Sequence, residues 1–83
     1  MLNNNQGHMK HKLISSKEIV KKFNLTYQTV NHYTNINLLH VVTRKGNVRM
    51  YDESQVKERL ARISQLISEG YPLRLVCKKL NKI

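Results

Sequence analysis

Apolar residues recur at helical spacing in the first part of the chain. Ile19 and Val20 lie four and three positions before Phe23, as on one face of an amphipathic helix. In front of them, Ser15 and Glu18 have the S-x-x-E spacing of a capping box, in which each side chain bonds the backbone N–H of the other residue. We therefore predict a short helix of about two turns that begins next to Ser15.

A second short helix is predicted after residues 24–26. Asn24 suits the left-handed conformation that ends many helices, and Thr26 is a favoured residue at a helix start. Val30 and Tyr33, three positions apart, provide the apolar side of the second helix. Two short helices with so brief a connection predict a helix-turn-helix, a motif whose second helix enters the major groove of DNA.

A strand pattern replaces the helical one after residue 40. Residues 41–43 and 48–51 are rich in β-branched and aromatic side chains, and they flank the turn sequence Arg-Lys-Gly-Asn at residues 44–47. We predict a two-stranded hairpin, or wing, with a cationic tip. An isolated hairpin is marginal in water, so this one must pack on the helices. The residues expected to make that contact are Val41, Val48 and Tyr51.

Two more helices are predicted after the wing. Asp52 and Gln55 repeat the capping-box spacing, and apolar residues then recur at helical intervals over residues 53–69. The apolar residues of this long helix are Val56, Leu60, Ile63, Leu66 and Ile67. Gly70 is expected to end the helix, and Pro72 to open a last, short one. The apolar stripe of the last helix consists of Leu73, Val76, Cys77 and Leu80.

These elements predict a mainly α fold, a winged helix-turn-helix in the order helix, helix, two-stranded wing, long helix, short helix. A chain of 83 residues is expected to form one domain. Residues 1–12 are mostly polar and have little to bury, so we interpret them as a flexible N-terminal tail. Residues 13–83 are then the winged helix-turn-helix DNA-binding domain.

The charge of the chain favours a nucleic-acid partner. Its formal net charge is +10, from 15 Lys and Arg residues against 5 Asp and Glu residues. A polyanionic partner is the simplest reason for such an excess, and together with the helix-turn-helix pattern it indicates double-stranded DNA. An enzyme is disfavoured, because no pairing of a nucleophile with a base is visible among so few acidic residues.

Membrane, metal and cofactor sites are not expected. No apolar run approaches the roughly 18 residues that a membrane span needs. His8 and His11 fall in the predicted tail, and His32 and His40 show no ligand geometry, so we predict no metal and no cofactor. The single Cys77 favours a reducing compartment, the cytoplasm, and the abundance of Asn, Lys and Ile is typical of an AT-rich bacterial, phage or plasmid genome.

Candidate DNA contacts lie on the second helix and on the wing. Tyr27 and Gln28 open the second helix, the end that usually meets base edges, and Gln can bond adenine through two hydrogen bonds. Arg44 and Lys45 at the wing tip are placed to meet phosphates. Tyr33 is equally suited to the core, with only its hydroxyl reaching a phosphate. The full predicted set is Thr26, Tyr27, Gln28, Asn31, His32, Tyr33, Arg44, Lys45, Asn47 and Arg49.

In three segments the chain resembles the winged helix-turn-helix domain of the MerR family of transcription regulators. The first helices of the family read roughly EVAKLLGVSxxTLRYYE, and residues 18–34 read EIVKKFNLTYQTVNHYT. The wing signature GGYRxYxExDV corresponds to GNVRMYDESQV at residues 46–56. The family segment LRELGFSLEEI corresponds to LISEGYPLRLV at residues 66–76. The resemblance implies a DNA-binding regulator with a winged helix-turn-helix fold.

Some positions follow the family pattern and others depart from it. Tyr33 and Arg49 match, and the resemblance implies that each contacts the DNA backbone or braces the wing. The family usually has Arg, an aromatic residue and Glu where this chain has Asn31, His32 and Thr34. The phosphate contact that the resemblance implies for the Arg is therefore not available from Asn31.

Two alternatives stand beside a sequence-specific transcription regulator. One is an architectural DNA binder, such as an excisionase or partition protein, that binds repeated sites cooperatively. The other is a protein-interaction module that docks an acidic partner. Full family members continue into a coiled-coil helix and an effector region, whereas no heptad pattern follows Ile83, so we expect a short form or a fragment of a longer regulator. We expect a monomer in free solution, with self-association on DNA or dimerisation through such a C-terminal region.

Overall fold

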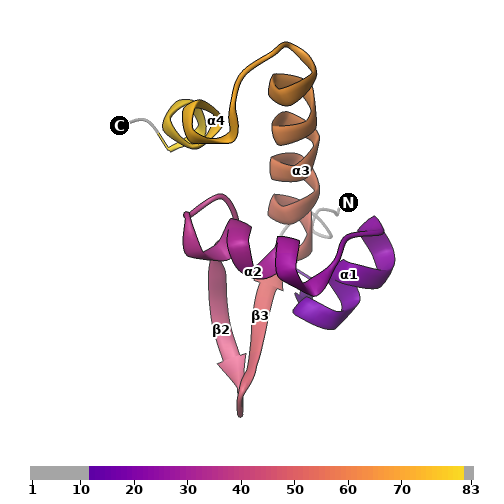
Figure 1. Ribbon diagram of the computed structural model, residues 1–83. Helices are drawn as coiled ribbons and strands as arrows, with labels where there is room; N and C mark the ends of the chain where they lie inside the picture. The colour runs from indigo at the N-terminus through magenta and orange to yellow at the C-terminus, as the bar shows by residue number, and fades with distance from the viewer. Residues whose placement is uncertain (1–11, 82–83) are drawn as a thin grey trace, which may run out of the picture.

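Four helices and a small sheet make up residues 12–81, the part of the chain that the computed structural model describes. In chain order the elements are β1 (Leu13–Ser15), α1 (Ser16–Phe23), α2 (Tyr27–Asn35), β2 (Val41–Lys45), β3 (Val48–Asp52), α3 (Glu53–Ser68) and α4 (Leu73–Leu80). Figure 1 shows α1 and α2 across the sheet, the hairpin of β2 and β3 extending away from α3, and α4 beside α3. The predicted mainly α winged helix-turn-helix is confirmed.

The sheet has a third strand that the sequence did not predict. Its strand order is β1-β3-β2, and both pairings are antiparallel. In β1, Ile14 lies opposite Tyr51, and Ser15 lies opposite Met50 and also caps α1. A strand of three residues that runs straight into a helix is too short to show alternation, so the hydrophobic pattern could not separate it from the helix start.

Local hydrogen bonds cap three helices at the residues predicted from the sequence. The Ser15 hydroxyl accepts from the Glu18 N–H at 3.2 Å, and the Glu18 carboxylate accepts from the Ser15 N–H at 2.8 Å, which completes the capping box. Thr26 caps α2 by accepting from the Thr29 N–H. Between the two helices Asn24 has a φ of 56°, the left-handed conformation expected there. Asp52 caps α3 through the Gln55 N–H.

Two clusters of buried apolar residues hold these elements together. The first lies between the sheet, α1, α2 and the start of α3, and consists of Ile14, Ile19, Val30, Leu39, Tyr51 and Val56. The second joins α3 to α4 and consists of Leu38, Ile63, Leu66 and Val76. Tyr33 and Leu60 pack against both clusters, so α2 and α3 connect them into one core.

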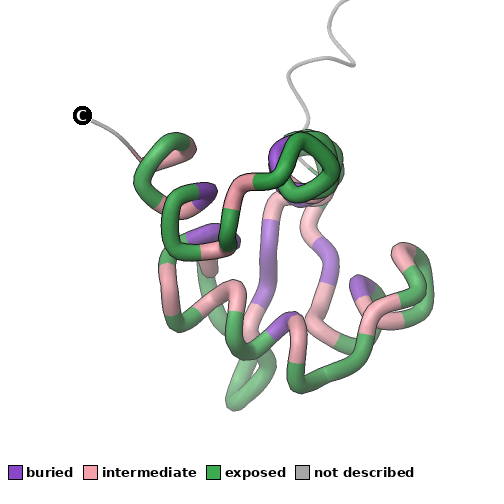
Figure 2. Tube along the Cα trace, turned by 45° about the horizontal axis from the view of Figure 1, so that its top comes forward, coloured by how far each residue is buried: buried purple, intermediate pink, exposed green. Residues whose placement is uncertain are grey.

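The predicted packing contact of Val48 is wrong, and one apolar residue of the long helix, Ile67, lies outside the core. Val48 is 47% exposed, and it pairs with Lys45 beside the wing turn. Ile67 is 46% exposed because Leu66 of the same turn packs toward α4 instead. Figure 2 shows the far end of the hairpin exposed, and the buried residues gathered where strands and helices meet.

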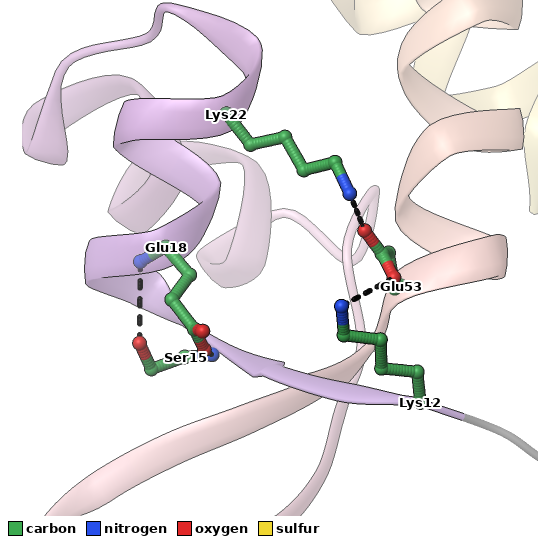
Figure 3. A network of polar contacts seen from close by, with 5 residues as sticks. All are labelled: Lys12, Ser15, Glu18, Lys22 and Glu53. Atoms are coloured by element: carbon green, nitrogen blue, oxygen red, sulfur yellow. Dashed lines mark hydrogen bonds and ion pairs between the residues drawn. The ribbon is translucent and has the colours of Figure 1, made fainter.

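Lys12, the last residue of the predicted tail, is bonded to the start of α3. Its carbonyl accepts from the Glu53 N–H at 2.9 Å, and its ammonium lies 3.8 Å from the Glu53 carboxylate. Lys22 of α1 also donates to this carboxylate, so one side chain joins three segments of the chain (Figure 3). The rest of the expected tail, including His8 and His11, lies outside the described residues.

Candidate nucleic-acid interface

The polar side of α2 faces solvent along its whole length. Val30 is fully buried and anchors the opposite side of the helix against the first core cluster. Consequently the predicted contact residues of this helix, Tyr33 excepted, point away from the core. The exposed ones are Thr26, Tyr27, Gln28, Asn31 and His32. A helix with one buried face and amide side chains on the other can present hydrogen-bonding groups to base edges in a major groove.

Tyr33 differs from the other predicted residues of α2. Its side chain is half-buried and packs against both core clusters, as the core interpretation of this residue anticipated. Its backbone carbonyl accepts from the N–H groups of Leu38 and Leu39, at 2.8 and 3.2 Å. Tyr33 therefore stabilises the end of α2 next to His32 through its core packing and its backbone carbonyl.

The wing presents cationic side chains at its tip. Arg44, Lys45 and Asn47 are exposed, and Arg49 is half-buried. The turn is tight because Gly46 has a φ of 60°, a conformation that favours glycine. Arg44 lies directly opposite Arg49 in the strand register. Like charges at facing positions destabilise a sheet, so this pairing is an unfavourable one that a bound anion would relieve.

A groove of about 440 Å³ brings the two predicted groups of residues together. Tyr27 and Asn31 of α2 form one side, and Asn47 and Arg49 of the wing form another. The start of α1 completes the groove. The full lining is Ser15, Ser16, Lys17, Tyr27, Asn31, Asn47, Val48 and Arg49. Thr26, Gln28, His32, Tyr33, Arg44 and Lys45 are not part of this lining.

Helix α1 contributes to this groove, which the sequence did not predict. Ser16 and Lys17 line it, and so does Val48, which was expected in the core. Lys17 lies on the polar side of α1, so the local sequence pattern gives no sign that it differs from an ordinary solvated lysine. Only the packing of α1 beside the wing places Lys17 next to residues far away in the sequence, and no local pattern indicates this.

No carboxylate among the described residues lines the groove. Glu18 is held in the capping box, and Asp52 caps α3. Glu53 is held between Lys12 and Lys22 (Figure 3). The hydrogen bond from Lys22 lowers the pKa of the Glu53 carboxyl below its ordinary value, and the charge of Lys12 acts in the same direction against the effect of burial. The groove thus keeps its cations uncompensated and is suited to an anion.

A second groove of about 440 Å³ lies between the end of α2 and α4. Its floor is apolar, and the basic side chains of Arg74 and Lys78 line it together with His32. The Cys77 thiol in its floor donates to the Ile36 carbonyl at 2.9 Å, which holds α4 against the end of α2. The expectation that Cys77 packs in the helix stripe agrees with this placement.

The described residues contain neither a metal cluster nor a membrane helix. Over residues 12–81 no group of three His, Cys, Asp or Glu side chains could hold a metal ion. Within the same range no helix is both long enough and apolar enough to cross a bilayer.

The chain was compared with known protein families, curated proteins and solved structures. A family model described as MerR HTH family regulatory protein matches residues 14–83 of this chain. Searches of curated proteins and of solved structures gave no significant match. The matched range begins in β1 and includes α1, α2, both strands of the wing, α3 and α4. It therefore covers every element that forms the core and the grooves.

Proposed function

Since the chain belongs to the MerR HTH family of regulatory proteins, it is a DNA-binding regulator, and we propose that it binds double-stranded DNA at specific sequences to control transcription. The single observation that carries this proposal is the groove between α1, α2 and the wing. It combines amide and hydroxyl groups on the exposed side of a helix with cations that no carboxylate of the described residues offsets. DNA offers the complementary pair of surfaces, base edges and phosphates.

In this proposal α2 lies in the major groove and supplies sequence choice. Gln28 and Asn31 are exposed amides that can each bond adenine through two hydrogen bonds. Tyr27 is 51% exposed at the start of the helix, and its ring can contact a thymine methyl or a sugar. Thr26 and His32 flank these residues on the same solvent-facing side.

The wing supplies affinity and register. Arg44 and Lys45 are exposed next to the turn and are long enough to reach phosphates beside the major groove that α2 occupies. Because phosphates are alike in every sequence, these contacts strengthen binding without selecting a site. They also explain why the wing keeps Arg44 opposite Arg49 at a cost to the free protein.

We also propose the setting in which this activity occurs. A DNA-binding regulator with a reduced cysteine fits the cytoplasm and nucleoid of a bacterium, or the genome of a phage or plasmid within one. The net charge of +10 disfavours self-association in free solution, since copies repel one another until DNA neutralises them. We therefore propose that any pairing of copies takes place on DNA.

Nuclease footprinting on fragments of the source genome tests the proposal. We expect protection of a discrete site at protein concentrations that leave random DNA unprotected. An extended array of protected direct repeats would favour the architectural alternative. Failure to protect or retard any duplex DNA, with the fold intact by circular dichroism, would contradict the proposal and favour an acidic protein partner.

A further inference from the structure

Lys17 stands apart from the other lysines of α1. Lys22 binds Glu53, and Lys21 lines a different hollow together with Glu18 and Glu53. Lys17 instead lines the groove between α2 and the wing, where no carboxylate of the described residues lies. Within residues 12–81 it makes no ion pair, so its ammonium is available to a ligand.

Arg49 reaches the same groove from β3. Arg49 lies two residues before Tyr51 in the strand, so the two side chains are on the same face of the sheet. The Tyr51 side chain is buried against α2, and Arg49 therefore points to the helix side of the sheet. Arg49 makes no ion pair among the described residues either. One groove is therefore lined by two unpaired cations, from α1 and from the wing, and also by Tyr27 and Asn31.

Resting on the proposed function, we propose that Lys17 and Arg49 together hold one DNA phosphate in this groove. A phosphodiester carries a single charge and two unesterified oxygens, so two cations can bind it from opposite sides. The Tyr27 hydroxyl lines the same space and can donate a hydrogen bond to it.

The consequence is a contact that fixes α2 against the DNA backbone. The phosphate would be held from α1, α2 and the wing together, because residues of all three line the groove. A contact of this kind positions the protein and does not select sequence. Loss of Lys17 should therefore weaken the preferred site and random duplex by the same factor.

Replacement of Lys17 by Gln, which keeps most of its length, tests the assignment. We expect Lys17→Gln to weaken DNA binding about tenfold near 0.1 M salt, and to lower the slope of log affinity against log salt by no more than about 0.9, the contribution of one phosphate. Lys57→Gln is the matched control. Lys57 is an exposed lysine of α3 that lines the hollow around Glu53 and not the groove. Lys57→Gln therefore removes the same charge at a site outside the groove. We expect Lys57→Gln to lower affinity much less.

A double-mutant cycle with Arg49→Gln tests whether the two cations share a phosphate. If they do, the double variant should bind only slightly more weakly than the weaker single variant. Losses that multiply would show two separate phosphates and overturn the shared site. Circular dichroism and thermal unfolding of each variant check that half-buried Arg49 is not needed for folding, and Lys17→Arg, which keeps the charge, should restore affinity.

The outcomes separate this inference from the proposed function. If the unmodified protein binds no DNA under any salt condition, the proposed function fails. If it binds DNA but Lys17→Gln binds as tightly, or loses no more than Lys57→Gln, only the phosphate assignment fails. In that second case the wing and α2 bind DNA without help from α1.

Discussion

At the scale of single residues, a buried polar pair joins α2 to the wing. Tyr51 has no exposed surface, and its hydroxyl lies 2.8 Å from the Thr34 hydroxyl. Thr34 donates its one proton to the Val30 carbonyl, so the Tyr51 hydroxyl is the donor in the pair. Thr34 stands where the MerR pattern has Glu, and here it satisfies a polar group inside the core.

This pairing predicts an asymmetric effect on stability. Thr34→Val leaves the buried Tyr51 hydroxyl without an acceptor and should cost about 1–3 kcal/mol. Tyr51→Phe removes the donor, while Thr34 keeps its bond to Val30, and this change should cost less, about 0.5–1.5 kcal/mol. Urea unfolding of both variants and of the double variant measures the difference. Equal costs for the two single changes would show that the hydroxyl pair is not the cause.

Residues of α2 and of the wing should differ in how they affect binding. Gln28→Ala should cost roughly 1–3 kcal/mol on the preferred site and little on random duplex, because amides meet base edges. Arg44→Ala should weaken both duplexes by similar factors and lower the salt slope by about one, because it removes a phosphate contact. Titrations at matched salt compare the two. Should Arg44→Ala remove only the preference while Gln28→Ala weakens both equally, the wing selects the sequence.

At the scale of secondary-structure elements, the connection between α1 and α2 depends on one backbone conformation. Asn24 has φ 56° and ψ 48°, and its N–H donates to the Val20 carbonyl at the end of α1. This left-handed geometry sets the direction in which the chain enters α2. A residue that disfavours the left-handed conformation would shift α2 relative to the wing. The groove between α2 and the wing would then change shape.

Substitutions at Asn24 should follow backbone preference. Asn24→Ala should destabilise the domain by about 1 kcal/mol, because the Ala methyl disfavours the left-handed region. Asn24→Gly should be neutral or slightly stabilising there, since glycine adopts this conformation without strain. Thermal or urea unfolding gives the order of the three proteins. If Gly and Ala are equally destabilising, the Asn side chain, not the backbone, holds the connection.

The elements differ in how far the sequence predicts them. The starts of α1, α2 and α3 are predictable because Ser15, Thr26 and Asp52 bond N–H groups only three positions away. Strand β1 is not, because its structure comes from pairing with β3 far along the chain. Val48 was misplaced because it lies three positions before Tyr51 in β3, and strand alternation puts the two side chains on opposite faces of the sheet.

The candidate site was predicted only in part for the same reason. Its predicted members on α2 and the wing belong to one motif each, so local patterns identify them. The groove depends on how α1, α2 and the wing pack together, and nothing in the sequence around Lys17 reports that arrangement. A lysine on the polar side of a helix has the same local pattern whether it meets solvent or a phosphate.

At the scale of the whole molecule, most acidic groups serve the fold and leave the grooves cationic. Glu53 joins the segment at Lys12, helix α1 and helix α3 through its two lysine partners (Figure 3). Its carboxyl is the group whose pKa is lowered in the folded protein, chiefly by the hydrogen bond from Lys22. The network therefore links folding to pH.

The direction of this pH dependence follows from the lowered pKa. Since the folded state binds the Glu53 proton more weakly than the unfolded state, its stabilisation is complete above the ordinary value of 4.5 and is lost as pH falls through the lower folded pKa. We expect the urea midpoint to decrease as the pH is lowered below about 4.5. This decrease should be less steep in Glu53→Gln, and smaller at high salt, which screens the charges. Glu58→Gln, at an exposed carboxylate of the same helix, is the control. An unchanged acid slope in Glu53→Gln would exclude the network as its source.

We propose that this chain binds DNA through phosphates held by the wing and α1 while α2 selects the sequence. The most direct test is a titration of the unmodified protein against its footprinted site and against random duplex over a salt series. We expect affinity to fall by orders of magnitude from low to physiological salt if about six or more phosphates are contacted. We also expect nearly parallel salt dependence for the two duplexes, with the footprinted site bound more tightly throughout. A flat salt dependence, or equal affinity for both duplexes at every salt concentration, would contradict it.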